Sequence, residues 1–269
     1  MIPISEAPAE SWRNVRFVFT DIDDTLTVDG RLLSSAYQAL ENLQNIGIGV
    51  IPITGRPAGW CDLIARFWPV EGVVGENGAF YFRYQRSLKQ MERFYADTVD
   101  VREQKRQKLN VLAQQILQEV PAAKVSSDQA YRESDLAIDI AEDVPRLDNH
   151  EIIKIVSIFE KAGATAKISS IHVNGWFGNY DKLTMTKTFA ARCLGMDLDL
   201  DNSHSIFIGD SPNDGPMFDF FAQSVGVANI RAFSDQLRTL PCYVTKKFGG
   251  AGFSEFTEAL ISLKKSSLA

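Results

Sequence analysis

The chain has 269 residues, and its 34 acidic against 28 basic side chains give a formal net charge of −6, which makes nucleic acid an unexpected partner. The composition, 45% hydrophobic and 23% charged, is typical of a globular protein. No apolar stretch approaches the roughly 20 residues that span a bilayer, so no membrane partner is expected.

The N-terminus, MIPISEAPAESW, lacks the basic and apolar regions of a secretory signal. The three cysteines, Cys61, Cys193 and Cys242, are isolated in the sequence, which argues against a disulfide framework or a zinc ribbon. Both features favour a cytoplasmic protein. A protein of that reducing compartment needs no secretory signal and rarely contains structural disulfides.

The N-terminal part of the chain alternates predicted strands and helices. Apolar or β-branched runs predict strands over 16–20, 48–54 and 72–74, and a turn at 76–78 leads into a further strand over 79–84. Pro57 is expected to open the helix between the second and third strands. Continuously apolar strands are typical of a parallel sheet covered by helices on both faces.

The middle third has its own alternation. It is highly charged from residue 85, with a helix expected from about residue 101. A strand at 136–141 and a helix at 149–162 follow, and then a strand at 166–170 that residues 171–176 continue. This segment is interpreted as an inserted domain.

The first pattern resumes after residue 179. Helices are predicted at 184–194, 217–221 and 254–263, and strands at 205–208, 225–228 and 243–245. The expected fold class is therefore α/β, with a doubly wound parallel (Rossmann-like) core sheet and an inserted smaller α+β domain. The predicted boundaries are 1–84 and 178–269 for the core and 85–177 for the insert.

Three polar clusters follow predicted strands directly: Asp21–Thr25, Thr54–Arg56 and Gly209–Asp214. Because ligands of open α/β sheets bind at the carboxyl ends of the strands, these clusters are expected to converge. Asp21 and Asp23 would lie about 6–7 Å apart on one side of extended chain. With Asp210 and Asp214 nearby, the carboxylates would repel strongly, and a divalent cation with oxygen ligands, such as Mg²⁺, would relieve this.

Phosphate binding also needs hydrogen-bond donors. The Thr54 hydroxyl and the backbone N–H groups near Gly55 lie just before a predicted helix, a favourable site for an anion. Lys182 precedes another helix and would balance both an acidic nucleophile and a bound phosphate. Lys187 is the alternative lysine for that role.

The ordered set Asp21-x-Asp23-x-Thr25, Thr54-Gly55-Arg56, Lys182 and Gly209-Asp210-x-x-Asn213-Asp214 resembles the haloacid dehalogenase-like hydrolase superfamily over the whole chain. The insert between the second and third motifs resembles the type-2B cap of subfamily IIB, the Cof-like and sucrose-phosphatase-like branch. Gly75–Ala79 resembles that branch too. Leu183 departs from it, because Cof-like members usually carry a small residue after the motif lysine.

The resemblance implies a two-step phosphoryl transfer. Asp21 would attack phosphorus and form an aspartyl-phosphate, while Asp23 would protonate the leaving alcohol and then deprotonate water. Mg²⁺ would be held by Asp21, the backbone carbonyl of Asp23 and Asp210, supported by Asn213 and Asp214. Thr54 and Lys182 would stabilise charge on the transferring phosphoryl group.

The inserted cap is expected to select the substrate. His172, Asn174 and Trp176 alternate with apolar residues or glycine and should share one strand face, which suggests either a sugar-binding surface or an ordinary half-exposed strand. The expected substrate contacts are Thr54, Gly55, Arg56, Asn77, Lys182, Arg132, Glu133, His172, Asn174 and Trp176. Arg56 is expected either on phosphate or substrate, or in solvent.

The function that follows is a Mg²⁺-dependent phosphatase acting on a small phosphorylated metabolite, with a sugar phosphate favoured. A phosphomutase of the same superfamily and a non-catalytic binding module remain alternatives. The expected partner is the small-molecule substrate, and the chain is expected to be a monomer or a homodimer.

Overall fold

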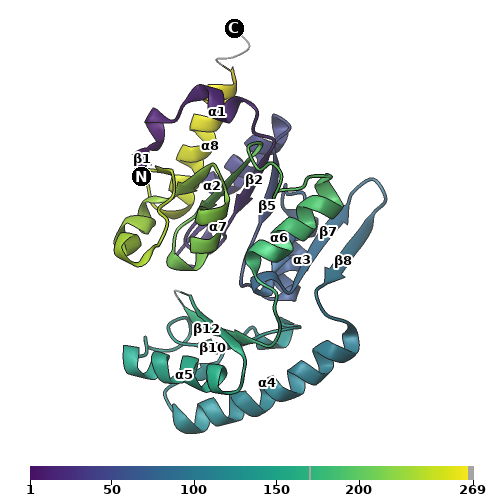
Figure 1. Ribbon diagram of the computed structural model, residues 1–269, viewed down its shortest axis with the longest axis vertical. Coiled ribbons are helices and arrows are strands. Elements are labelled where there is room, and N and C mark those ends of the chain that lie inside the picture. The colour runs from purple at the N-terminus through teal and green to yellow at the C-terminus, as the bar shows by residue number, and fades with distance from the viewer. Residues whose placement is uncertain (170, 266–269) are drawn as a thin grey trace.

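The structure, a computed structural model, describes residues 1–169 and 171–265 and contains two bodies joined by two crossings of the chain (Figure 1). The larger body is built around a parallel sheet. The smaller body consists of an antiparallel sheet backed by helices α4 and α5. Each helix in the described ranges is too short or too polar to cross a lipid bilayer.

The parallel sheet has six strands, and every neighbouring pair is parallel. From edge to edge they are β1 (Ile2–Pro3), β15 (Tyr243–Val244), β14 (Ser224–Gly226), β13 (Ser205–Gly209), β2 (Phe17–Thr20) and β5 (Gly49–Pro52). Strands β13 and β5 flank β2, so the polar segments that follow these three strands emerge at one edge.

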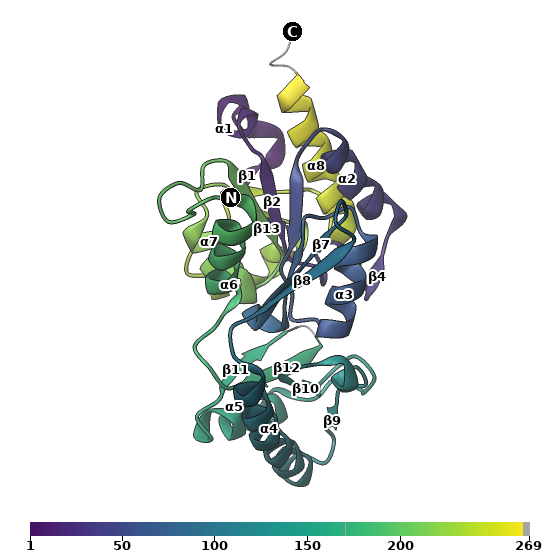
Figure 2. The ribbon, with the colours of Figure 1, turned by 90° about the vertical axis from the view of Figure 1, so that its right-hand side faces the viewer.

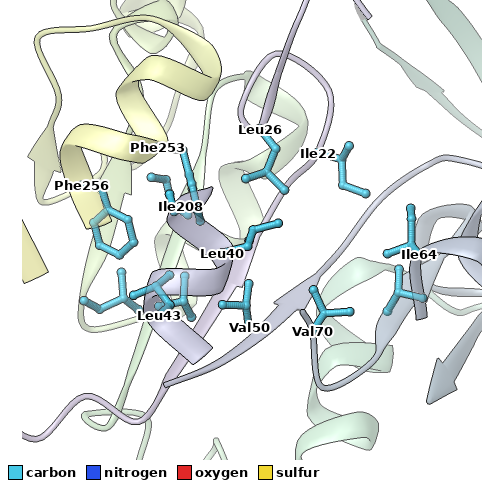
Figure 3. Packing of buried hydrophobic residues seen from close by; sticks show 14 of the residues in the cluster. Ile22, Leu26, Leu40, Leu43, Val50, Ile64, Val70, Ile208, Phe253 and Phe256 are labelled. Carbon is cyan, nitrogen blue, oxygen red and sulfur yellow. The ribbon is translucent and has the colours of Figure 1, made fainter. Parts of the chain in front are cut away.

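Helices cover both faces of this sheet, because its strands carry apolar side chains on both faces. Val18 and Val50 pack toward one face, while their neighbours Phe19 and Ile51 pack into a separate cluster on the other. The first face carries α1 (Ala9–Arg13), α2 (Ser34–Asn45), α3 (Ala58–Phe67) and α8 (Gly249–Lys265) (Figures 2 and 3). The second carries α6 (Lys182–Phe189) and α7 (Gly215–Phe220). The predicted α/β class with a doubly wound core is confirmed.

Short elements connect these layers. They are η1 (Ile4–Glu6), the two-stranded flap β3 (Thr27–Val28) and β4 (Arg31–Leu32), the π-helix η4 (Ala190–Leu194), and the 3-10 helices η5 (Pro212–Asp214) and η6 (Ala228–Gln236).

A three-stranded antiparallel sheet extends the larger body. Strand β6 (Val73–Gly75) leads through η2 (Glu76–Gly78) into β7 (Phe80–Gln85), as the sequence predicts. Strand β8 (Gln90–Tyr95), which the charged sequence concealed, pairs with β7 along its whole length. Met91 and Tyr95 of β8 pack against the core beside the parallel sheet. The predicted boundary at residue 85 thus falls inside a hairpin, and we propose that the insert begins after β8.

The smaller body comprises α4 (Val99–Glu119), β9 (Lys124–Val125), η3 (Gln129–Tyr131), β10 (Leu136–Asp139), α5 (Asn149–Lys161), β11 (Thr165–Ile168) and β12 (His172–Trp176). Its sheet has the antiparallel order β11-β12-β10-β9. Strand β12 was expected to continue β11. It instead folds back as its hairpin partner, and Ser170, in the connection, lies outside the described residues.

The sheet of the smaller body has one apolar and one polar face. Val173 packs with α4 and α5. His172, Asn174 and Trp176 alternate with it and lie on the opposite face, from which Trp176 packs into the apolar core of the larger body. Strand β12 itself lies on the side of the smaller body that faces the larger one (Figure 1). The polar face is therefore the side that meets the strand ends of the core.

Candidate active site

The ends of β2, β13 and β5 bring together segments far apart in the sequence. Asp21 follows β2 and donates its backbone N–H to Ile208 of β13 at 3.0 Å. Asp210 follows β13 directly. A Cβ atom on Gly209 would lie 2.4 Å from Asp214 Oδ2, so glycine at this position lets the Asp214 carboxylate fold against the strand end.

Asp21, Asp210 and Asp214 form a compact group. One carboxylate oxygen from each lies within 4.8 Å of the others, and all three residues are buried. Burial, reinforced by the Asp214 and Asp21 carboxylates, raises the pKa of Asp210 well above its usual value. The backbone N–H of Asp210 donates to Asp214 Oδ2 at 3.1 Å, and the Thr25 hydroxyl donates to Asp210 Oδ1 at 3.1 Å. Converging oxygen ligands of this kind can hold a divalent cation.

Lys182 lies against this group at the start of α6. Its Nζ donates to Asp21 Oδ1 at 2.6 Å and to Asp214 Oδ1 at 3.2 Å. Asp181 caps the helix, accepting from the Thr184 N–H at 2.7 Å. Although burial alone would lower the pKa of Lys182, the Asp21 and Asp214 carboxylates raise it, so the lysine is a fixed cation.

Burial, aided by the Asp214 and Asp23 charges, raises the pKa of Asp21 to about 7 despite the opposing charge of Lys182. A carboxylate is nucleophilic only as the anion, so any added positive charge at this position favours the reactive form of Asp21.

Lys187 lies one turn further along α6 and contacts Asp199 at 2.6 Å, with its side chain 31% exposed. The structure therefore places Lys182, and not Lys187, among the carboxylates.

This placement leads to a prediction for the two lysines. Replacing Lys182 by alanine removes the cation that faces Asp21, and we expect kcat to fall by about 100-fold or more. Lys187→Ala removes an exposed ion pair and should change kcat less than about threefold. Steady-state phosphate release measured side by side checks this, and equal losses in the two variants would contradict it.

Asp23 is held by Arg56, which follows β5. Arg56 Nε and Nη2 donate to Asp23 Oδ1 at 3.0 and 2.9 Å, and Nε also lies 3.1 Å from Oδ2. The Thr54 hydroxyl oxygen accepts the Arg56 backbone N–H at 3.0 Å, and this leaves the hydroxyl proton of Thr54 available for another acceptor. Arg56 is buried, so of the two sequence interpretations the solvated one is wrong.

Glu142 lies in the loop that follows β10, and its side chain reaches Arg56 from the smaller body. Its Oε1 accepts from Arg56 Nη1 at 3.0 Å, and its Oε2 lies 2.8 Å from His172 Nε2. The His172 contact and the Arg56 charge lower the pKa of Glu142 to about 2, outweighing partial burial. Glu142 is thus a carboxylate acceptor at neutral pH.

The other substrate contacts expected in the smaller body are bonded to other residues of the protein, in part across the joint between the two bodies. Arg132 pairs with Asp128 and Asp135 and donates to the Gly55 carbonyl at 2.9 Å. Asn174 donates to Asp135 at 3.0 Å.

The indole N–H of Trp176 donates to the Tyr180 carbonyl at 3.3 Å, and the indole stacks on the Tyr180 ring. His172, Asn174 and Trp176 do share a face, but each is 5% exposed or less, so they present neither the open sugar-binding surface nor the half-exposed strand expected.

The loop of η2 joins the two bodies. Glu76 Oε1 accepts from the backbone N–H groups of Ala58 and Glu133, both at 2.9 Å. Its Oε2 accepts from Ser134 at 2.6 Å and from Asp135 at 3.2 Å. Burial and the nearby Asp135 charge act to raise the pKa of Glu76, while the Arg132 charge and these backbone donors act to lower it.

Asn77, the next residue, is buried beside Gly55, and its Nδ2 has no hydrogen-bond partner among residues 1–169 and 171–265. Gly78 at φ +102° approaches the Asp181 carbonyl so closely that a Cβ would lie 2.0 Å away. This loop thus packs directly against the residue that precedes Lys182. Asn213 lies in η5, one residue before Asp214, and is partly exposed.

Two cavities meet at Asp23. One, of about 570 Å³, is mainly apolar, with Ile22, Trp60, Leu63 and Tyr131 among its lining residues. The other, of about 360 Å³, is polar and is lined by Asp24, Asp29, Arg56 and Glu142 among others. Asp23 therefore lines both cavities, at the place where they adjoin.

Sequence reasoning did not identify Glu142 or the carboxylate of Glu76 as contacts of the site. Glu142 follows a predicted strand, but the sheet of the smaller body is antiparallel, so the rule that places ligands at the carboxyl ends of parallel strands does not apply to it. Nothing in the local sequence of Glu76 shows that its four donors come from residues 58 and 133–135.

The profile of the haloacid dehalogenase-like hydrolases matches residues 18–246. A haloacid dehalogenase-like hydrolase from Bacteroides thetaiotaomicron is 16% identical, with a TM-score of 0.63 over 91% of this chain and 98% of that one. The sucrose-phosphatase from Synechocystis is 17% identical, with a TM-score of 0.58 over 93% and 98%. A sugar phosphatase of subclass IIB is 15% identical, with a TM-score of 0.59 over 95% and 100%.

None of the curated proteins matches this sequence. The family profile covers most of the chain, and the similar structures cover nearly all of it, including both bodies. The chain therefore belongs to the haloacid dehalogenase-like hydrolases and has the fold of their subclass IIB.

Proposed function

We propose that this protein is a Mg²⁺-dependent phosphatase that hydrolyses a small phosphorylated metabolite through an aspartyl-phosphate on Asp21. The observation that carries the proposal is the position of Asp21, within 4.8 Å of the Asp210 and Asp214 carboxylates and 2.6 Å from Lys182. A buried nucleophilic carboxylate beside a fixed cation fits covalent phosphoryl transfer.

The donor set suits a hard divalent ion. Asp21, Asp210 and the backbone carbonyl of Asp23 would hold Mg²⁺, with Asp214 and Asn213 orienting them. The like charges of Asp21, Asp210 and Asp214 are costly to bury together unless a cation partly neutralises them. Bound Mg²⁺ would supply charge stabilisation for the phosphoryl oxygens.

Each of the site residues has a separate role in the two steps of the reaction. An Asp21 oxygen forms a bond to phosphorus as the bond to the leaving oxygen breaks, and Asp23 gives its proton to that oxygen. Water next attacks phosphorus and gives a proton to Asp23, which releases inorganic phosphate and restores the Asp21 carboxylate. Lys182 and the Thr54 hydroxyl stabilise the charge on the phosphoryl oxygens.

A sugar phosphate is the favoured substrate. Carboxylates in the polar cavity, such as Glu142 and Asp29, can accept hydrogen bonds from hydroxyl groups. Trp60 and Tyr131 in the adjoining cavity offer apolar ring faces beside them. The combination suits a leaving group with both hydroxyl groups and apolar faces.

The test is phosphate release from a panel of sugar phosphates and other phosphomonoesters, with Mg²⁺ and with excess chelator. We expect release with Mg²⁺, a loss of about 100-fold or more on chelation, and recovery when Mg²⁺ is restored. Isomerisation of a sugar phosphate without release would indicate a phosphomutase. Phosphate release that survives complete chelation would contradict the metal requirement.

A further inference from the structure

Arg56 lies between carboxylates from the two bodies. On one side it contacts Asp23 through Nε and Nη2, and on the other its Nη1 contacts Glu142 at 3.0 Å. The Trp60 ring lies 4.5 Å from the centre of the guanidinium. A planar guanidinium with its donors engaged on two edges and an aromatic ring against its face has a fixed orientation.

In this orientation Arg56 makes unequal hydrogen bonds with the two carboxylate oxygens of Asp23. Oδ1 accepts from both Nε and Nη2, at 3.0 and 2.9 Å. Oδ2 has only a shared contact with Nε, at 3.1 Å. The side chain of Asp23 is 28% exposed and lines both cavities. Oδ2 therefore keeps a lone pair that can carry a proton. In the first step this proton passes to the leaving group, and in the second Oδ2 accepts a proton from water.

Glu142 is itself held in place by the smaller body. Asp139 Oδ1 accepts the backbone N–H of Glu142 at 2.8 Å, and Asp139 Oδ2 accepts that of Asp143 at 2.8 Å. His172 Nε2 lies 2.8 Å from Glu142 Oε2. The end of β10 thus presents the Glu142 carboxylate to Arg56 in a defined position.

From these contacts we infer that Glu142 is a positioning residue for the general acid and base. By holding Nη1, it keeps Arg56 turned so that Nε and Nη2 bind Asp23 Oδ1 and leave Oδ2 for proton transfer. The inference rests on the proposed phosphatase activity. It also means that the proton-transfer group of the core is complete only when the smaller body is docked on it.

Phenyl phosphates of nearly equal size test this, because they differ chiefly in how much the leaving oxygen needs a proton. The parameter is kcat/KM, which reports the steps up to formation of the aspartyl-phosphate and excludes its hydrolysis. For Glu142→Ala we expect kcat/KM to fall about 10- to 100-fold with phenyl phosphate and less than about threefold with 4-nitrophenyl phosphate.

Two further variants separate positioning from other roles. Glu142→Gln keeps an acceptor oxygen for Arg56 Nη1 and should recover part of the loss with phenyl phosphate. Asp143→Ala removes the neighbouring exposed carboxylate, which contacts Ser127, and should leave both substrates unchanged. Thermal melting of each variant confirms that it is folded.

The outcomes are distinct. A selective loss with phenyl phosphate supports the positioning role. Equal losses with the two substrates, or no loss with either in a folded Glu142→Ala variant, overturn it while leaving the phosphatase proposal intact. A wild-type protein that releases phosphate from neither these esters nor the sugar-phosphate panel overturns the proposed function itself.

Discussion

Replacing Asp21 by asparagine is expected to abolish phosphate release, with kcat reduced by about 10⁴-fold or more. The amide is a far weaker nucleophile than the carboxylate, and it no longer offers Lys182 a charged acceptor. The measurement is phosphate release with the best substrate of the panel at saturating Mg²⁺, together with a search for phosphorylated protein by intact mass spectrometry.

The Asp21→Asn protein should remain folded. Asparagine has nearly the shape of aspartate and removes one of three clustered like charges, while Lys182 keeps the Asp214 carboxylate as a partner. The melting temperature is therefore expected to stay close to that of the wild type. Undiminished phosphate release in a clean, folded preparation would remove Asp21 from the role of nucleophile.

The second large effect concerns stability. Glu76→Ala leaves four backbone N–H groups without their acceptor: the buried ones of Ala58, Ser134 and Asp135 and the partly buried one of Glu133. Each unpaired buried donor is costly, and we expect the free energy of unfolding to fall by about 3–5 kcal/mol. Chemical denaturation followed by circular dichroism measures it.

Two comparisons sharpen the Glu76 result. Glu76→Gln keeps one acceptor oxygen but turns an amide N–H₂ toward other donors, so it too should be strongly destabilised. Glu103→Ala, an exposed carboxylate on α4, should change stability by less than about 0.5 kcal/mol. If Glu76→Ala unfolded at the same denaturant concentration as Glu103→Ala, water would be replacing the carboxylate at little cost.

The core of the fold was predictable because its signals are local. The apolar runs before Asp21 and Asp210 indicate buried parallel strands, and the strand-end rule brings their aspartates together. Strand β8 was missed because it is an outer strand of its small sheet and its sequence, Gln90–Tyr95, carries charged side chains that masked the strand pattern.

The joint between the two bodies was not predictable from sequence. The alternation of β12 correctly groups His172 and Asn174 on one face, but a period of two cannot tell whether that face meets solvent or another domain. Likewise, an arginine after a strand gives no indication that its partners are Asp23 and Glu142. The pairing with Glu142 depends on how the two bodies pack against each other.

The Glu76 carboxylate also sets how the two bodies can move. Its four donors come from α3 and from residues 133–135, so separating the bodies there would strand buried polar groups on both sides. The contact between Arg56 and Glu142 involves a partly exposed carboxylate that water can solvate once it is released. Breaking the Arg56–Glu142 contact therefore costs less than breaking the contacts of Glu76, and the two bodies are joined more weakly beside Asp23 than at the loop of η2.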